Sequence, residues 1–445
     1  MTGFIAIPAA GALWLRRART ARPLLASPPA GPADRDDNVL IDLRIVDGKI
    51  AAIEPAGPAR DGPAVDLDGS QLWPAFADLH THLDKGHIWP RRRNEEGSFA
   101  GALEGVADDR GARWSEADVL ARMEFGVRCA LVHGTAAIRT HIDSMGEQGP
   151  ISWSAFRKLR DRWSGKMTLQ AVNLVPMDYF LTDAAVGLAD LVADSGGILG
   201  GVTRTTGGVH DRLADDFDAQ LDRIFALATE RGLDLDFHVD ESGSLEAKAL
   251  IRIAQAARRN RFKGRILCGH CCALALQPDE FIDDTLKACA DVGLGIVSLP
   301  MCNMYLQARA PGKTPRWRGV TLLHEMRAAG LTVAVASDNC RDPFYAYGDH
   351  DMMEVFTQAV RIAHLDHPFG AWPRAATGAP ADLMGLPQAG RLAVGAPADL
   401  VVFRGRTFSE LLSRRQSDRV VLRAGRVVTD VLPDYRELDP LMTGT

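Results

Sequence analysis

Short apolar runs alternate with amphipathic stretches through the middle of the chain. The amphipathic stretches have apolar positions at helical spacing, and each run between them is long enough for one buried strand. This alternation is typical of βα units, and eight such units predict an α/β fold, a (β/α)8 TIM barrel. The predicted strands are residues 74–80, 136–143, 167–175, 198–203, 233–238, 265–270, 294–299 and 331–338. The predicted helices include residues 115–132, 215–231, 244–258, 279–292 and 322–329.

Both ends of the chain have a different pattern, with short strands separated by turns. Asp47-Gly48 and Ala424-Gly425 each lie between two apolar segments and are typical of hairpin turns. Two terminal β segments around a long α/β middle predict that the termini pair into one small β-sandwich. We therefore expect two domains, a β-sandwich of residues 1–73 plus 388–445 and a barrel of residues 74–387.

The composition is that of an ordinary globular protein. Of the 445 residues, 46% are hydrophobic and 24% charged, and the net charge of −6 gives no sign of nucleic-acid binding. No apolar stretch is long enough to span a membrane, and arginines follow the apolar start instead of preceding it, the reverse of a secretory signal. Seven cysteines, an odd number, favour a reducing compartment. We expect a cytoplasmic protein that binds neither nucleic acid nor membrane.

The first predicted barrel strand ends in a group of polar residues, His80, His82, Asp84 and Lys85. Alternate side chains of a strand lie on the same face, so the two imidazoles point the same way. Such a pair can bind one divalent metal, although a pair by itself is also common among ordinary polar residues at strand ends.

Three later strands also end in residues suited to metal or proton chemistry. His238 ends the fifth strand and is followed by Glu241, His270 ends the sixth, and Asp338 ends the eighth. The carboxyl ends of parallel barrel strands meet at one mouth, so we expect these side chains to lie together. Three histidines and one carboxylate suit a single divalent ion and leave Zn or Fe open. The predicted metal ligands are His80, His82, His238 and Asp338.

Cysteines around His270 suggest a second kind of metal site. Cys268, Cys271 and Cys272 include a Cys-x-x-Cys spacing, but no second pair with matching spacing accompanies it. Small buried thiols at a strand end are therefore favoured over a zinc site.

Six motifs together resemble a known family. They are His-Thr-His-Leu-Asp at 80–84, His-Val-Asp-Glu at 238–241, Gly-His at 269–270, the segment 303–307, Ser-Asp at 337–338 and the segment 342–345. This set resembles the amidohydrolase superfamily and, within it, the cytosine deaminase-like branch. The resemblance spans nearly the whole chain and implies a barrel with a β-sandwich from both termini, and a homo-oligomer. The superfamily's dinuclear branch carries a lysine on strand four, which the stretch 200–204 lacks.

The predicted reaction is metal-hydroxide attack on an amidine-like ring carbon. A divalent metal lowers the pKa of bound water from about 15.7 to about 7. Glu241 is predicted to carry protons to the ring nitrogen and the leaving amine, although capping of the following helix is an alternative. His270 is expected to hydrogen-bond the attacking oxygen, and Asp338 to orient the water. These catalytic residues match the family's positions.

The substrate is less sharply indicated. Asn339, His141 and Asn303 are predicted to bind substrate, with loop packing as the alternative for Asn303. The stretch 173–179 lacks the glutamine with which the cytosine deaminase pattern reads the pyrimidine edge, and Asn339 replaces that pattern's second acidic residue. An amide in place of a carboxylate changes the donors that a substrate meets. We therefore expect cytosine or a related pyrimidine or triazine.

Other polar residues near the predicted mouth have two interpretations each. Lys85 suits a structural salt bridge or a substrate contact, and the arginines at 91–93 suit a solvated loop or a contact with an anionic substrate. His210, after strand four, lies where a pocket residue is expected.

The sequence thus predicts a mononuclear metal-dependent hydrolase that deaminates a small nitrogen heterocycle. One alternative is an amidohydrolase that cleaves a cyclic or linear amide. Another is a non-catalytic metal-binding scaffold or sensor, which would have no need of a proton carrier such as Glu241.

Overall fold

The computed structural model describes residues 4–58 and 60–442, and the chain packs into two compact units. The first, which we call the β unit, comprises the chain up to Asp78 together with residues 128–137 and 350–433. The second, the barrel unit, comprises residues 79–127, 138–349 and the chain from Asp434 onward. The predicted domain boundaries at 73/74 and 387/388 stay a prediction.

The β unit is built around one eight-stranded sheet to which both ends of the chain contribute. Its order is β16-β15-β14-β5-β1-β2-β3, with β4 on β1, and β14 runs antiparallel to β5. The predicted turns at Asp47-Gly48 and Ala424-Gly425 are confirmed, and all four residues have positive φ. The strands are β1 (Ala12–Ala21), β2 (Asn38–Val46), β3 (Lys49–Pro55), β4 (Ala64–Asp66), β5 (Gln71–Pro74), β14 (Leu400–Phe403), β15 (Val420–Arg423) and β16 (Arg426–Val427).

Apolar side chains from one face of this sheet form the core of the β unit. Leu15, Ile41, Leu72, Leu400 and Leu422 come from five different strands, and each is fully buried. These side chains therefore form one contiguous apolar core that joins the N-terminal and C-terminal strands of the sheet.

An ion pair holds the start of one helix in the β unit. Asp351 caps α10 (Met352–Ala363) by accepting a hydrogen bond from the Met353 amide at 2.9 Å, and it receives two bonds from Arg419 at 2.6 and 2.7 Å. Burial raises the pKa of this carboxyl, but Arg419 and His133 outweigh burial and lower the pKa to about 2.

We expect Asp351→Asn to lower the free energy of unfolding by about 2 kcal/mol at pH 7, since the folded pKa is about 2 against 3.8 unfolded. A depressed folded pKa contributes stability that is present above about pH 4 and is lost as the pH falls toward 2. Denaturant titrations of parent and variant at pH 7 and pH 3 measure this difference in the free energy of unfolding. An equal loss at both pH values would contradict the ion-pair explanation.

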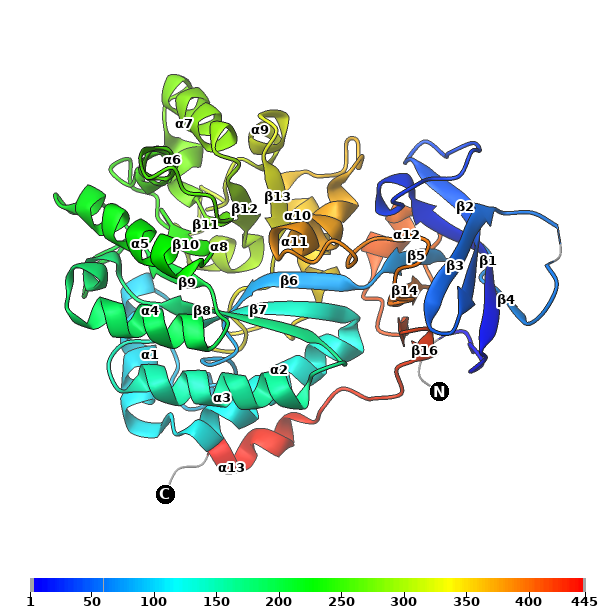
Figure 1. The fold of residues 1–445 in the computed structure, drawn as a ribbon, viewed down its shortest axis with the longest axis horizontal. Helices are drawn as coiled ribbons and strands as arrows, with labels where there is room; N and C mark the ends of the chain where they lie inside the picture. The colour runs from blue at the N-terminus through cyan, green and yellow to red at the C-terminus, as the bar shows by residue number, and fades with distance from the viewer. Residues whose placement is uncertain (1–3, 59, 443–445) are drawn as a thin grey trace. The chain divides into compact units, whose positions relative to one another are not determined.

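The predicted eight-stranded barrel is confirmed. Two hydrogen-bonded groups, β6-β7-β8 and β9-β10-β11-β12-β13, are joined by parallel bridges from Val172 to Ile198 and from Thr81 to Asp338, which close the ring. Figure 1 shows strands and helices alternating from β6, in light blue, to β13, in yellow. The strands are β6 (Phe76–Thr81), β7 (Thr135–Asp143), β8 (Thr168–Leu174), β9 (Leu199–Val202), β10 (Leu235–Val239), β11 (Ile266–His270), β12 (Gly295–Ser298) and β13 (Thr332–Val335).

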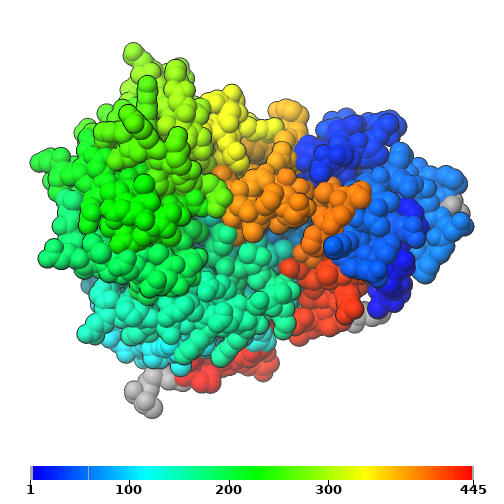
Figure 2. All heavy atoms as spheres, viewed as in Figure 1, coloured from blue at the N-terminus to red at the C-terminus, as the bar shows by residue number. Residues whose placement is uncertain are grey.

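Helices follow the barrel strands, and in Figure 2 the green atoms, which include those of α5 and α6, cover part of the visible face of the barrel unit. Within residues 4–58 and 60–442, no helix is long and apolar enough to cross a bilayer. The longer helices are α1 (Phe99–Arg113), α2 (Glu116–His133), α3 (Gln148–Arg162), α4 (Ala184–Asp194), α5 (Phe217–Arg231), α6 (Ala249–Arg259) and α7 (Asp279–Asp291). The shorter helices and turns are η1 (Arg22–Leu24), η2 (Met177–Leu181), η3 (Cys272–Leu276), α8 (Pro300–Leu306), α9 (Leu323–Ala328), η4 (Trp372–Ala376), α11 (Gly378–Leu383), α12 (Phe408–Ser413), η5 (Tyr435–Leu438) and α13 (Asp439–Met442).

Two predicted boundaries differ from the structure by three residues or more, both beside the barrel mouth. The helix predicted from residue 244 begins at Ala249, because the Asp240 carboxylate accepts hydrogen bonds from the Ala249 and Leu250 amides and sets the first turn there. The eighth strand ends at Val335, before Asp338, whose amide bonds the His80 carbonyl at 2.9 Å.

Candidate metal centre and substrate cavity

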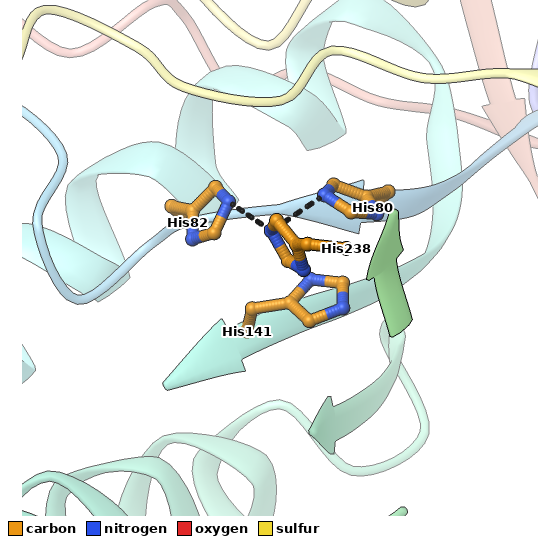
Figure 3. Close-up of side chains that lie close together, drawn as sticks. All are labelled: His80, His82, His141 and His238. Atoms are coloured by element: carbon orange, nitrogen blue, oxygen red, sulfur yellow. Dashed lines mark hydrogen bonds between the residues drawn. The ribbon is translucent and has the colours of Figure 1, made fainter. Parts of the chain in front are cut away.

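Three imidazoles and one carboxylate converge at the carboxyl ends of the barrel strands. His238 on β10 has its Nε2 3.2 Å from the Nε2 atoms of both His80 and His82. Asp338 Oδ1 lies 3.3 Å from His82 Nε2 and 3.8 Å from His80 Nε2. Figure 3 shows the three rings turned toward one another, with the two short contacts dashed.

This spacing fits the coordination shell of one metal ion. Ligand atoms at tetrahedral corners, with metal–nitrogen bonds of 2.0–2.1 Å, lie about 3.3 Å apart. Burial lowers the pKa of His80, His82 and His238 well below the usual value, and neighbouring charged groups lower it further, so their rings are neutral with lone pairs available. The donor set therefore suits a divalent cation such as Zn²⁺ or Fe²⁺.

Backbone strain marks the same place. Asp338, His270 and Asp240 have φ values of 63°, 68° and 47°, in the left-handed region that residues other than glycine rarely adopt. Strain of this kind is retained where the surrounding structure enforces it, and it is concentrated at functional sites.

Asn303 links the two predicted proton-handling residues. Its Nδ2 lies 2.9 Å from His270 Nδ1 and 3.3 Å from Glu241 Oε1. An amide NH₂ only donates, so His270 Nδ1 accepts and the neutral ring carries its proton on Nε2. Burial lowers the pKa of His270 to about 3, which keeps this ring neutral.

Glu241 lines the cavity. Its neighbour Asp240, and not Glu241, accepts the hydrogen bonds from the first amides of α6. The Glu241 side chain is buried. Burial raises the pKa of Glu241 well above the usual value, and the nearby Asp338 raises it further. A carboxyl group in this environment can hold a proton near neutral pH, as a general acid requires.

His141 belongs to the imidazole cluster but contacts a different carboxylate. Its ring centroid lies 4.0 Å from that of His80, and its Nε2 is 3.2 Å from Asp236 Oδ1. Asp236 in turn accepts a bond of 3.0 Å from Arg139. In Figure 3 the His141 ring approaches His238 from the other side of the two dashed contacts.

A cavity of about 320 Å³ opens beside the candidate metal ligands. Its apolar wall includes Phe99, Leu103, Val106 and Ala107 from α1, Phe344, and residues at or just after the ends of β7, β8 and β9, namely Met145, Leu174, Val175, Pro176 and Val202. Its polar wall consists of Lys85, Arg110, Asp143, Arg204, His210 and Asn339, and its floor of His82, His238, Glu241, His270 and Asp338. Asn303 and His141, also predicted to bind substrate, are not among the described residues on its surface.

Lys85 forms the predicted salt bridge and also lies on the cavity wall, where its contact with substrate stays a prediction. Its Nζ lies 2.7 Å from Asp143 Oδ1, and Arg110 Nη1 lies 2.7 Å from the other oxygen of that carboxylate. The Asp143 amide donates to Asp84 Oδ2 at 2.7 Å, which ties the end of β7 to the segment after β6. Both cations therefore share one carboxylate.

The possible contact between the arginines at 91–93 and an anionic substrate is not found. Arg91 is buried in ion pairs with Asp109 at 2.7 Å and Asp118 at 2.6 Å, and Arg92 pairs with Asp108 at the surface. No arginine of this run is on the cavity surface among the described residues. The predicted buried thiols are confirmed, because Cys268, Cys271 and Cys272 are free and buried.

Sequence reasoning missed the α1 wall and Arg204. A signal for α1 was available, since Ser98 caps the helix by accepting from the Gly101 amide and apolar residues recur at 99, 102, 103 and 106. Arg204 lies two residues after the end of β9 and had no comparable signal.

A sequence model of the amidohydrolase family matches residues 117–429. The chain belongs to the amidohydrolase family. It is 54% identical over 403 residues to a pterin deaminase of Rhizobium rhizogenes, covering 90% of each protein. It is 24% identical over 400 residues to N-isopropylammelide isopropyl amidohydrolase of a Pseudomonas species, covering 87% of this chain and 93% of the relative.

Solved amidohydrolase structures share the fold. A 5-methylcytosine deaminase of Klebsiella pneumoniae with bound 5-fluorocytosine superposes with a TM-score of 0.78 at 21% identity, covering 95% of this chain and 98% of the other. The predicted barrel with a separate β-rich domain is confirmed. The comparisons also confirm the predicted activity class, a metal-dependent hydrolase that deaminates a nitrogen heterocycle.

Proposed function

We propose that this amidohydrolase removes the 2-amino group of a pterin ring. The reaction joins water to C2 of the 2-amino-4-oxopteridine and releases ammonia, leaving a 2,4-dioxopteridine. The observation that carries the proposal is the 54% identity to a pterin deaminase over 90% of both chains.

The shape of the cavity supports a flat bicyclic ring. Phe99 and Phe344 stand on its wall with ring centroids 5.5 Å apart and planes tilted by 73°, beside Leu103 and Val106. Apolar and aromatic walls of this kind bind the faces of heteroaromatic rings, and a volume of about 320 Å³ is ample for a pterin.

His80, His82, His238 and Asp338 are the residues that would hold one divalent metal. When bound, this metal supplies a water of lowered pKa for attack on the ring. The ligand set and the choice between Zn and Fe are part of the proposal.

The proton steps fall to Glu241 and His270. Glu241 gives a proton to the ring nitrogen beside C2, takes up the proton of the oxygen that has added to C2, and passes it to the leaving amino group. His270, with its proton on Nε2, donates a hydrogen bond to the oxygen that adds to C2. Asn303 holds both side chains through its single amide nitrogen.

Ammonia release from a panel of rings tests the proposal. Protein loaded separately with Zn²⁺ and Fe²⁺ is given pterin, isocytosine, cytosine and amino-triazines. We expect a kcat/KM on the order of 10⁴ M⁻¹s⁻¹ or more with pterin, a typical enzyme value, and lower values with the monocyclic rings.

If a monocyclic ring releases ammonia and pterin does not, that ring would replace pterin as the proposed substrate. Hydrolysis confined to amides would favour the amidohydrolase alternative, and a metal-bound but inactive protein would favour the scaffold. Assembly into a homo-oligomer and a cytoplasmic location stay predictions.

A further inference from the structure

Three cationic side chains lie on the cavity wall, and one of them differs from the others. Lys85 and Arg110 share the Asp143 carboxylate, each at 2.7 Å. Arg204 forms no ion pair with a carboxylate in the part of the chain that the structure describes. Among the described residues it is therefore the cation on this wall without a carboxylate partner.

The hydrogen bonds of Arg204 leave one edge of its guanidinium group available. Nη1 donates to the carbonyls of Thr205 and Gly208 at 3.2 and 3.3 Å. Nε is buried and has no hydrogen-bond partner. Nε and Nη2 form the side of the guanidinium that presents two parallel N–H donors, the fork that binds paired acceptors.

Burial makes this edge costly to leave unfilled. Desolvation lowers the pKa of Arg204, and the charges of Asp143, Asp178 and Glu241 offset this lowering only in part. A buried N–H donor without an acceptor is unfavourable, so a ligand that offers acceptors at this place gains affinity.

The backbone fixes where the guanidinium starts. The Arg204 amide donates to the Val202 carbonyl at 2.7 Å, and its carbonyl accepts from the Met177 amide at 3.0 Å. Pro176 and Val202 form the parallel bridge between the ends of the third and fourth strands. Arg204 therefore stands beside the segment after strand three, where the cytosine deaminase pattern has a glutamine that this chain lacks.

We propose that Arg204 is a specificity-determining residue that binds the O4 and N5 edge of the pterin, an assignment that rests on the proposed function. These two acceptors lie side by side on the fused ring, as O6 and N7 do in guanine, where arginine is the commonest specific partner. Cytosine, isocytosine and triazines lack the N5 acceptor. A fork at this position therefore selects bicyclic rings over monocyclic ones.

The test removes either partner of the contact. On the protein, Arg204→Met removes the fork, and Arg204→Lys keeps the charge without it. On the ligand, 5-deazapterin replaces N5 by a CH group. We expect the kcat/KM of Arg204→Met with pterin to fall about 10- to 100-fold, the usual loss for a bidentate contact. The kcat/KM of the parent should fall by a similar factor when 5-deazapterin replaces pterin. The kcat/KM of Arg204→Met should be nearly the same with 5-deazapterin as with pterin. Arg204→Lys should resemble Arg204→Met.

Isocytosine is the control for folding, because it has the reacting 2-amino-4-oxo ring without N5. A variant that retains its activity on isocytosine but loses its preference for pterin supports the assignment. Equal losses on pterin, 5-deazapterin and isocytosine would overturn it and leave Arg204 a structural residue of its loop.

Binding separates this inference from the proposed function. Pterin fluorescence is titrated with metal-loaded Glu241→Gln and with the double variant Glu241→Gln/Arg204→Met. Weaker binding by the double variant supports the Arg204 contact even if the parent releases no ammonia from pterin, in which case only the proposed function fails. Equal binding with normal deamination by the parent overturns the contact alone. No pterin binding by either protein overturns both.

Discussion

Glu241→Gln is expected to lower kcat for ammonia release by about 10³-fold, within the range found when a general acid–base is removed. The amide preserves the size of the side chain and can still contact Asn303, but it cannot carry a proton between the ring nitrogen and the leaving group. KM should change little, and the metal content should equal that of the parent, because Glu241 is outside the proposed ligand set.

The matched control is Glu246→Gln, the same substitution at an exposed glutamate five residues along. It should leave kcat unchanged. A loss below about fivefold in Glu241→Gln would be too small for a general acid–base and would assign the proton transfers to another group.

His238→Asn is expected to abolish both metal binding and activity. The Nε2 atom of His238 lies close to the Nε2 atoms of both His80 and His82, so the substitution removes the central nitrogen of the proposed ligand set. Metal analysis after dialysis should fall from about one ion per chain to a trace, since a tetrahedral site that loses a protein ligand retains only three at most.

His141→Asn is the informative partner of that variant. His141 lies in the same imidazole cluster, but its Nε2 faces Asp236. We expect this variant to keep its metal while losing activity through the altered packing of His80. Loss of the metal in His141→Asn with retention in Asp338→Asn would replace Asp338 by His141 in the ligand set.

That the residues of the candidate site lie close together could be predicted, because each of them occupies the end of a predicted strand. His80 and His82 are two residues apart, and His238, His270 and Asp338 each follow an apolar run. A parallel barrel brings such positions together whatever the helices outside do. The apolar runs and the barrel topology both place these residues at the carboxyl ends of the strands, so no long-range contact had to be known.

The contacts that lie outside strand periodicity could not be predicted in this way. Arg91 is buried because Asp109 and Asp118 reach it from two different helices, and nothing near residue 91 signals those partners. The bridge from Asn303 to Glu241 and His270 joins three separate βα units. Such pairings depend on side-chain reach in three dimensions, which spacing along the chain does not encode.

The two sides of the cavity are encoded very differently along the chain. The floor collects residues from strand ends between His80 and Asp338, so any change there risks the whole chemistry. Four of the ten apolar residues that line the cavity come from one 15-residue helix, α1, inserted between β6 and α2. Exchange of that one helix between relatives can therefore alter which ring is accepted while every group that performs the reaction stays in place, so that substrate range and chemistry can evolve independently in this fold.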